Sequence, residues 1–285
     1  MKTDAFLIIK GRYLVALWFI AFFYLPGVDY IIYQLLKPTD EWYWFDLIYY
    51  YYYHAIIACG ILILLYLEKP NLRAMFSKFQ RNELAPSFKL TAFIFVFSIA
   101  AIYILYYPLS FIWPEFVQYW YLDTPPFIYY SETETYPITP NILSFFSMVL
   151  FAPFIEELIF RGLLLHRWNQ KWGLKKAIIV SSLLFGLLHP DPIGATAFGI
   201  AMCIVYLRTQ SLWVPILCHA LNNLVVWLLE AGYQAYWGPS EYYTVEDFQN
   251  EWLWGLISIT IVIIWLHTYL DKPRSYRAWN LPNIH

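Results

Sequence analysis

Two adjacent glutamates and an arginine stand in the otherwise apolar stretch FAPFIEELIFRG, residues 151–162. Glu157 and Arg161 are four residues apart with the acid first, which is the order that favours an ion pair on one face of a helix. Glu156 is turned by about 100° from Glu157 and therefore has no partner on its own helix. A carboxylate left without a cation is a candidate general base, because it can take a proton from a water molecule.

Two later stretches carry further polar groups in apolar surroundings. FGLLHP ends with His189 directly before a proline that interrupts the helix. CHALNN places His219 and Asn223 four residues apart, one above the other on a helix. Peptide hydrolysis needs a base for water, donors for the tetrahedral oxyanion and an acid for the leaving amine. Carboxylate, imidazole and amide groups can supply these functions without a serine or cysteine nucleophile.

The composition indicates that these groups belong to a membrane protein. Of the 285 residues, 60% are hydrophobic and only 13% are charged, against roughly a quarter charged residues in a soluble domain. A membrane-spanning helix needs about 20 mainly apolar residues, and about eight segments approach this length. We therefore predict an all-α polytopic membrane protein with about eight transmembrane helices, forming one membrane domain over residues 1–285. The predicted spans are 13–36, 43–67, 90–113, 141–166, 175–189, 193–207, 211–230 and 251–270, of which the fifth and sixth are short.

The basic residues predict the orientation of these helices, because Lys and Arg are retained on the cytoplasmic side. If both termini, the segments 68–89 and 167–176, and residue 208 are cytoplasmic, 16 of the 18 Lys and Arg residues lie there. The segments 114–140 and 231–250 contain acids and no Lys or Arg. This alternation supports the predicted number of spans, since removing one would place the later loops on the wrong side.

The candidate residues fall at a similar depth in the predicted membrane. At about 1.5 Å per helical residue, Glu156 lies about 15 Å and His189 about 18 Å from the cytoplasmic ends of their helices. Asn223 lies about 18 Å from the corresponding end of its helix, with His219 one turn lower. A charged side chain at mid-span costs about 2.5–3.5 kcal/mol, so such residues usually pair or serve a function. Four polar groups from three helices at one level therefore indicate a functional site.

Other features have structural interpretations. The aromatic run that begins at Tyr43, YWFDLIYYYYYHA, falls at the outer end of the second span, where Tyr and Trp favour the membrane interface. We interpret it as an interfacial belt that includes His54. Cys59, Cys203 and Cys218 fall inside spans, which argues against disulfides and against a Cys-rich metal site.

Three motifs in these stretches resemble those of the CAAX protease and bacteriocin-processing family (CPBP, or Abi). EELIFR from Glu156 fits EExxxR, FGLLH from Phe185 fits FxxxH, and HALNN from His219 fits HxxxN, in the order typical of that family. The resemblance covers residues 140–230, which we expect to form the catalytic core. It implies an intramembrane glutamic endopeptidase, whose eukaryotic counterparts remove the last three residues of prenylated CAAX proteins.

The resemblance also implies a division of roles within this polar group. Glu156 and His189 would activate water, and His219 and Asn223 would stabilise the oxyanion. The remaining pair, Glu157 and Arg161, would shape the site.

We expect no cofactor under this mechanism. The zincin motif HExxH is absent. Glu156, His189 and His219 are nevertheless residue types that bind Zn²⁺, so a zinc site remains an alternative.

Three functions fit these residues. The first is an endopeptidase acting on membrane-embedded or lipid-anchored peptides or proteins. The second is a non-catalytic bacteriocin-immunity or scaffold protein of the same fold, and the third is a proton-coupled transporter, because intramembrane carboxylates and histidines also relay protons. We expect a multi-pass protein of the bacterial plasma membrane with both termini cytoplasmic, or alternatively of the endoplasmic reticulum membrane, with no nucleic-acid partner.

Overall fold

The computed structural model describes residues 43–79, 81–130, 136–238 and 243–270, and in addition residues 13, 16, 30, 31, 34 and 281. Throughout this part of the chain the regular structure is helical, which confirms the predicted all-α class. The earlier helices are α3 (Tyr43–Glu68), α4 (Leu72–Met75), η1 (Arg81–Glu83), α5 (Leu84–Ile112), α6 (Pro114–Val117) and η2 (Gln118–Leu122). The later ones are α7 (Ile138–Phe145), η3 (Phe146–Phe151), α8 (Ala152–Glu157), η4 (Leu158–Leu164), α9 (Leu165–Trp172), α10 (Leu174–Leu187), α11 (Pro192–Thr209), α12 (Trp213–Trp237), α13 (Val245–Asn250) and α14 (Trp252–Leu270).

Five helical stretches of the described residues are long and apolar enough to cross a membrane, so the chain is a multi-pass membrane protein. They are Tyr43–Leu67, Arg81–Ile112, Ile138–Trp172, Pro192–Thr209 and Trp213–Tyr236. These correspond to the second, third, fourth, sixth and seventh predicted spans.

The predicted count of about eight spans is not confirmed. The fifth predicted span forms α10, whose 14 residues extend only about 21 Å, whereas the hydrocarbon core of a bilayer is about 30 Å thick. The eighth forms α14, which contains a shorter apolar helix, Trp252–Thr268. The first, 13–36, lies almost wholly outside the described residues.

The stretch 138–172 is one long helix that changes its winding on both sides of the two glutamates. The segments η3 and η4 are π-helical, whereas α8 between them is an α-helix. Pro153 in the first turn of α8 has no N–H to donate to the preceding turn, which accounts for an interruption at this point. Single π-helical turns within α-helices frequently occur at functional sites.

A tight turn joins α10 to α11 inside the bundle. Pro190 and Pro192 prevent α10 from continuing, and Asp191 caps α11 by accepting a hydrogen bond from the Gly194 N–H at 3.0 Å. The Tyr106 hydroxyl of α5 donates a hydrogen bond to the Pro190 carbonyl. This turn therefore holds the end of α10 in a fixed place against α5.

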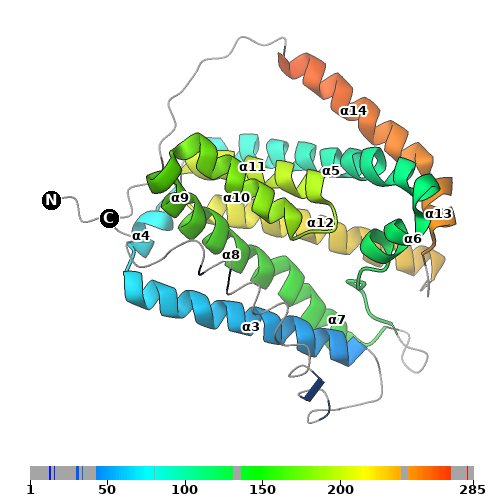
Figure 1. Cartoon of the computed structure of the whole chain (residues 1–285), viewed down its shortest axis with the longest axis horizontal. Coiled ribbons are helices and arrows are strands. Elements are labelled where there is room, and N and C mark those ends of the chain that lie inside the picture. Colours follow the sequence, from blue (N-terminus) through cyan, green and yellow to red (C-terminus); the bar gives the residue numbers. More distant parts are fainter. Residues whose placement is uncertain are drawn as a thin grey trace.

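Apart from the turn between α10 and α11, the connections gather at two ends of the bundle (Figure 1). At one end, beside α4, the Leu212 N–H donates to the Met75 carbonyl at 2.8 Å, and the Ser77 hydroxyl donates to the Gln210 carbonyl at 2.7 Å. At the other end, beside α6 and α13, Gln118 donates to the Tyr243 carbonyl at 3.1 Å. The basic segment after α3 and the acidic segment around α13 thus lie at opposite ends, as the charge alternation requires.

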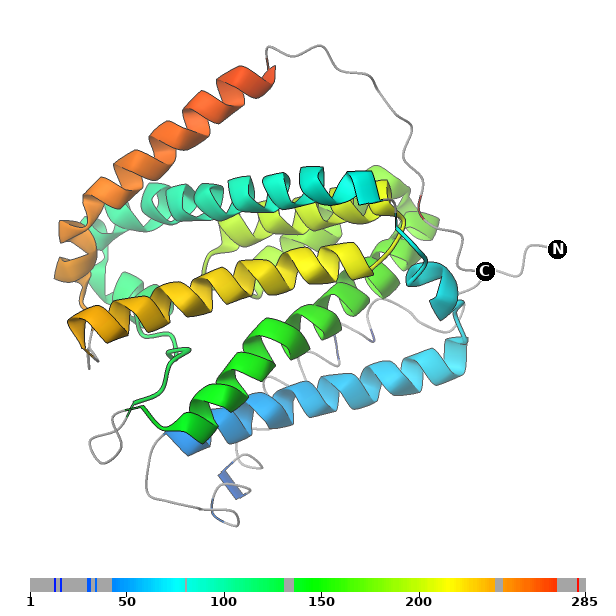
Figure 2. The same cartoon turned by 180° about the vertical axis from the view of Figure 1, so that it is seen from behind.

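Seen from behind, α5, α12, the long helix 138–172 and α3 follow one another across the bundle (Figure 2). α12 packs on α5, η3 and α8, whereas α3 packs on α7. The main apolar core lies between the long helix, α5, α10 and α11, and includes Phe160, Leu163, Met202 and Val205. α8 contributes Ile155 to this core, and Glu157 of the same helix is fully buried.

Candidate active site

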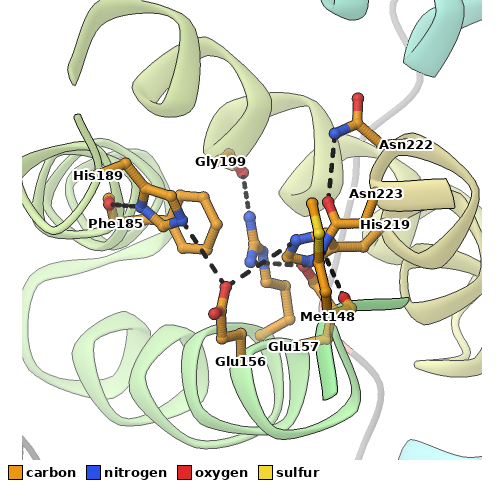
Figure 3. A network of polar contacts seen from close by, with 10 residues as sticks. Met148, Glu156, Glu157, Phe185, His189, Gly199, His219, Asn222 and Asn223 are labelled. Carbon is orange, nitrogen blue, oxygen red and sulfur yellow. Dashed lines mark hydrogen bonds and ion pairs between the residues drawn. The ribbon is translucent and has the colours of Figure 1, made fainter. Parts of the chain in front are cut away.

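The structure brings together residues from the three predicted motifs (Figure 3). α8 carries Glu156 and Glu157, the turn after α10 carries His189, and α12 carries His219. Glu156 lies between the two histidines, which approach it from different helices. The similar depth inferred from residue counting thus corresponds to a real convergence of side chains.

A buried network surrounds Glu157. The Arg161 Nη1 donates to Glu157 Oε1 at 2.8 Å, and the other guanidinium nitrogen, Nη2, donates to the Gly199 carbonyl of α11 at 3.1 Å. His219 Nδ1 also lies 3.0 Å from Glu157 Oε1. The ion pair predicted from the spacing of four residues is therefore present, and it is joined to a catalytic candidate on another helix.

Glu156 has a different environment. Its side chain is 16% exposed, and its Oε2 atom lies 3.9 Å from His219 Nε2 and 4.0 Å from His189 Nε2. These separations exceed a direct hydrogen bond, which places the two atoms at about 2.7–3.2 Å. Polar groups at such a separation are commonly bridged by a water molecule. The three atoms thus define a place where a small polar molecule can contact a carboxylate and two imidazoles.

The hydrogen bond at the far side of each ring fixes how the two histidines face Glu156. His189 Nδ1 lies 2.7 Å from the Phe185 carbonyl, which only accepts hydrogen bonds, so this nitrogen carries the proton. His219 Nδ1 faces the carboxylate of Glu157 and likewise donates. Each ring therefore presents its other nitrogen, Nε2, to Glu156.

Aromatic rings form the wall behind these groups. Phe185 stacks on His189 with ring centroids 4.4 Å apart, and Phe198 of α11 meets the His219 ring at 4.8 Å. The Arg161 guanidinium lies over Phe185, 4.9 Å from its centroid. These contacts restrict the rotation of both imidazoles and keep water away from the ion pair.

Asn223 lies one helical turn beyond His219, but its amide is engaged elsewhere. Its Nδ2 donates to the Met148 carbonyl in η3 at 3.0 Å, and its Oδ1 accepts from Asn222 at 3.4 Å. Asn223 thus ties α12 to the long helix about two turns before Glu156. The assignment of Asn223 as an oxyanion donor stays a prediction. It requires the second hydrogen of Nδ2 to reach the oxyanion.

Three residues of α3 that belong to the aromatic run interpreted as an interfacial belt lie near the site. Tyr50, Tyr53 and His54 are close enough to Glu156 for its carboxylate to act on them electrostatically. His54 is only 5% exposed, its Nδ1 lies 2.7 Å from the Tyr50 carbonyl, and its ring meets Phe151 edge-on at 6.5 Å. Their spacing places them on one helix face, which is the one signal in the sequence that pointed to a shared role.

The alternative zinc site would need Glu156, His189 and His219 as its ligands. Within the described ranges, no group of three His, Cys, Asp or Glu side chains has an arrangement suited to holding a metal ion. Cys59 is exposed, whereas Cys203 and Cys218 are buried and free, so the predicted absence of disulfides holds for these cysteines.

Comparison with known proteins agrees with the motifs. A family model described as type II CAAX prenyl endopeptidase Rce1-like matches residues 138–225, which confirms the resemblance over this region. A protein of Bacillus subtilis (strain 168) named "Putative membrane peptidase YdiL" is 33% identical over 82 residues, which amount to 28% of this chain and 34% of that protein. The matched region thus spans about a third of that relative. No solved structure matches the chain.

Proposed function

We propose that this chain, which belongs through residues 138–225 to the Rce1-like type II CAAX prenyl endopeptidase family, is an intramembrane endopeptidase acting on membrane-embedded or lipid-anchored peptides. The observation that carries the proposal is the position of Glu156, whose carboxylate faces two imidazole nitrogens at 3.9 and 4.0 Å inside the bundle. An unpaired carboxylate beside two oriented imidazoles is suited to activating water and poorly suited to simple packing.

In the proposed reaction, a water molecule lies between Glu156 and His189. His189 Nε2 is a hydrogen-bond acceptor, because the Nδ1 proton is held by the Phe185 carbonyl. It can therefore orient the water while Glu156 takes its proton. The water oxygen then attacks the carbonyl carbon of the substrate, and the carbonyl oxygen becomes the oxyanion of a tetrahedral intermediate.

His219 differs from His189 in the partner of its ring. Its Nδ1 proton is held by the negatively charged Glu157 carboxylate, whereas the Nδ1 proton of His189 is held by a neutral carbonyl. When its Nε2 carries a proton, His219 can donate a hydrogen bond to the oxyanion. When the C–N bond breaks, Glu156 returns its proton to the leaving amine, so the products are a carboxylic acid and a free amine, and the acid then passes its remaining proton to the amine or to water.

The α3 residues give this site a further wall. His54 Nε2 is left as an acceptor by the bond between Nδ1 and the Tyr50 carbonyl, and the hydroxyls of Tyr50 and Tyr53 can donate and accept. A peptide chain offers matching N–H and C=O groups. We assign His54, Tyr50 and Tyr53 to positioning the substrate beside Glu156.

The test uses the full-length chain reconstituted in liposomes with a library of C-terminally lipidated and transmembrane peptides. Wild type should cleave members of the library, and Glu156→Gln should lose nearly all turnover while still binding them. His219→Ala, which removes an oxyanion donor, should retain measurable activity lowered by about 10²–10³-fold.

Each alternative predicts a different result in the same assay. Cleavage that persists in Glu156→Gln would refute the assigned base. Activity that a strong chelator abolishes and zinc restores would replace the Glu156 and His189 mechanism with a metal site. Failure of wild type to cleave any peptide would support the immunity or scaffold function instead.

A further inference from the structure

The corner between α9 and α10 concentrates positive charge at one end of the bundle. Arg167, Lys171, Lys175 and Lys176 all fall within ten residues, and no Asp or Glu occurs between residues 158 and 190. The three lysines are exposed. Gly173, with a φ of 81°, provides the left-handed conformation that lets α10 begin directly after α9.

A groove opens beside these charges. Trp172, Lys176, Ile179 and Val180 line this groove, which is a shallow and open depression of about 320 Å³. The Lys176 stem contributes apolar surface to this groove while its ammonium group can extend towards water. The neighbouring Lys171 lies over the Trp172 ring, 4.9 Å from its centroid, so a second cation is held at the same level.

An apolar strip continues from the groove along the outer face of α10. Ile179, Val180, Leu183 and Leu187 are all exposed. The opposite face of α10 is buried, through Ser181, Ser182, Phe185 and Gly186. From Lys176 to Leu187 the strip extends about 16 Å at 1.5 Å per residue. It faces away from Glu156 and is therefore separate from the candidate active site.

We propose that this groove binds a phospholipid with an anionic headgroup. The order of groups along α10 matches that molecule, with cations at one end for the phosphate, an indole at the level of the interface, and aliphatic side chains for an acyl chain. The positive charge that residues 167–176 concentrate at this corner selects an anionic over a zwitterionic headgroup. The proposal does not depend on peptidase activity.

Native mass spectrometry of the detergent-solubilised full-length chain tests this site. Phosphatidylglycerol and phosphatidylcholine with the same acyl chains are titrated separately, and the retained lipid is counted. Phosphatidylglycerol should bind more tightly to wild type. In the double variant Lys175→Gln/Lys176→Gln its affinity should fall about 30-fold at low salt, because each lysine contributes about fivefold.

Two further variants separate a built site from a generally basic surface. Lys78→Gln/Lys89→Gln removes two exposed cations elsewhere in the basic segments and should leave phosphatidylglycerol binding unchanged. Val180→Trp fills the groove but keeps every lysine, and it should weaken binding of both lipids. Unchanged helical circular dichroism confirms that the variants are folded.

Several outcomes would overturn the proposal. An equal loss of phosphatidylglycerol affinity in Lys78→Gln/Lys89→Gln would show that the effect comes from the general positive charge of the surface. Undiminished binding in Val180→Trp would show that the groove is not occupied. Displacement of the lipid by excess inorganic phosphate would identify a site for a free anion instead.

Discussion

Neutralising Glu157 should destabilise the protein far more than neutralising Glu156. Glu157 is fully buried and Arg161 is 1% exposed, and one carboxylate oxygen bonds both to the Arg161 Nη1 at 2.8 Å and to His219 Nδ1 at 3.0 Å. In Glu157→Gln the amide keeps the shape and one acceptor oxygen but loses the charge. Arg161 then remains as a buried cation that keeps its hydrogen bond to the Gly199 carbonyl and its contact with the Phe185 ring but has lost its anionic partner.

The magnitude follows from the cost of an uncompensated buried charge. Removing one partner of a buried ion pair typically costs about 3–5 kcal/mol. For a chain of this size, 1 kcal/mol corresponds to about 2–4 °C in melting temperature, so the midpoint should fall by roughly 6–20 °C. Glu156 is 16% exposed and has no ionic partner closer than the two imidazoles, so Glu156→Gln should shift the midpoint by only a few degrees.

Thermal unfolding of the purified variants in one detergent measures this difference. The double variant Glu157→Gln/Arg161→Met provides a control. It also removes the buried charge that has lost its anionic partner, so it should recover a large part of the lost stability. Equal midpoints for Glu157→Gln and Glu156→Gln would refute the division of the two glutamates into a structural and a chemical one. No recovery in the double variant would show that the loss does not come from the charge of Arg161.

Three further predictions concern other parts of the chain. In a variant lacking native cysteines, a single cysteine that replaces Lys78 should react only with reagents applied from the cytoplasmic side, and one that replaces Thr124 only with reagents applied from the other side. Labelling of position 78 from outside would contradict the predicted orientation. His54→Phe should raise KM for a cleaved peptide several-fold with little change in kcat. A several-fold fall in kcat with KM unchanged would instead give His54 a part in the chemical step. Burial raises the pKa of Asp191 from 3.8 to about 6. The ionised carboxylate therefore favours the unfolded state above pH 6, and the stability of wild type should increase as pH falls from about 6 to 4. Asp191→Asn still caps Gly194 and should lack this gain; identical pH profiles of midpoint temperature would contradict it.

Local spacing was enough to predict the chemistry of single helices. The ion pair between Glu157 and Arg161 could be predicted from the sequence, because residues four apart on one helix are neighbours whatever surrounds them. The membrane class followed from the apolar composition, and the order of the three motifs identified the region that the family model matches. Residue counts along helices also predict a similar depth for Glu156, His189, His219 and Asn223, because the rise per residue is constant.

Contacts between helices depended on the tertiary structure, because the rotation of one helix against another is set by packing. The bond from His219 to Glu157 and the engagement of Asn223 with the Met148 carbonyl cross from α12 to the long helix, and no spacing in the sequence encodes them. The face of α3 that carries His54 was read as a membrane interface, since aromatic residues favour that position and also favour packing. Pro190 already marks the fifth predicted span as short in the sequence, but its place against α5 follows only from the tertiary structure, through the bond from Tyr106 to the Pro190 carbonyl.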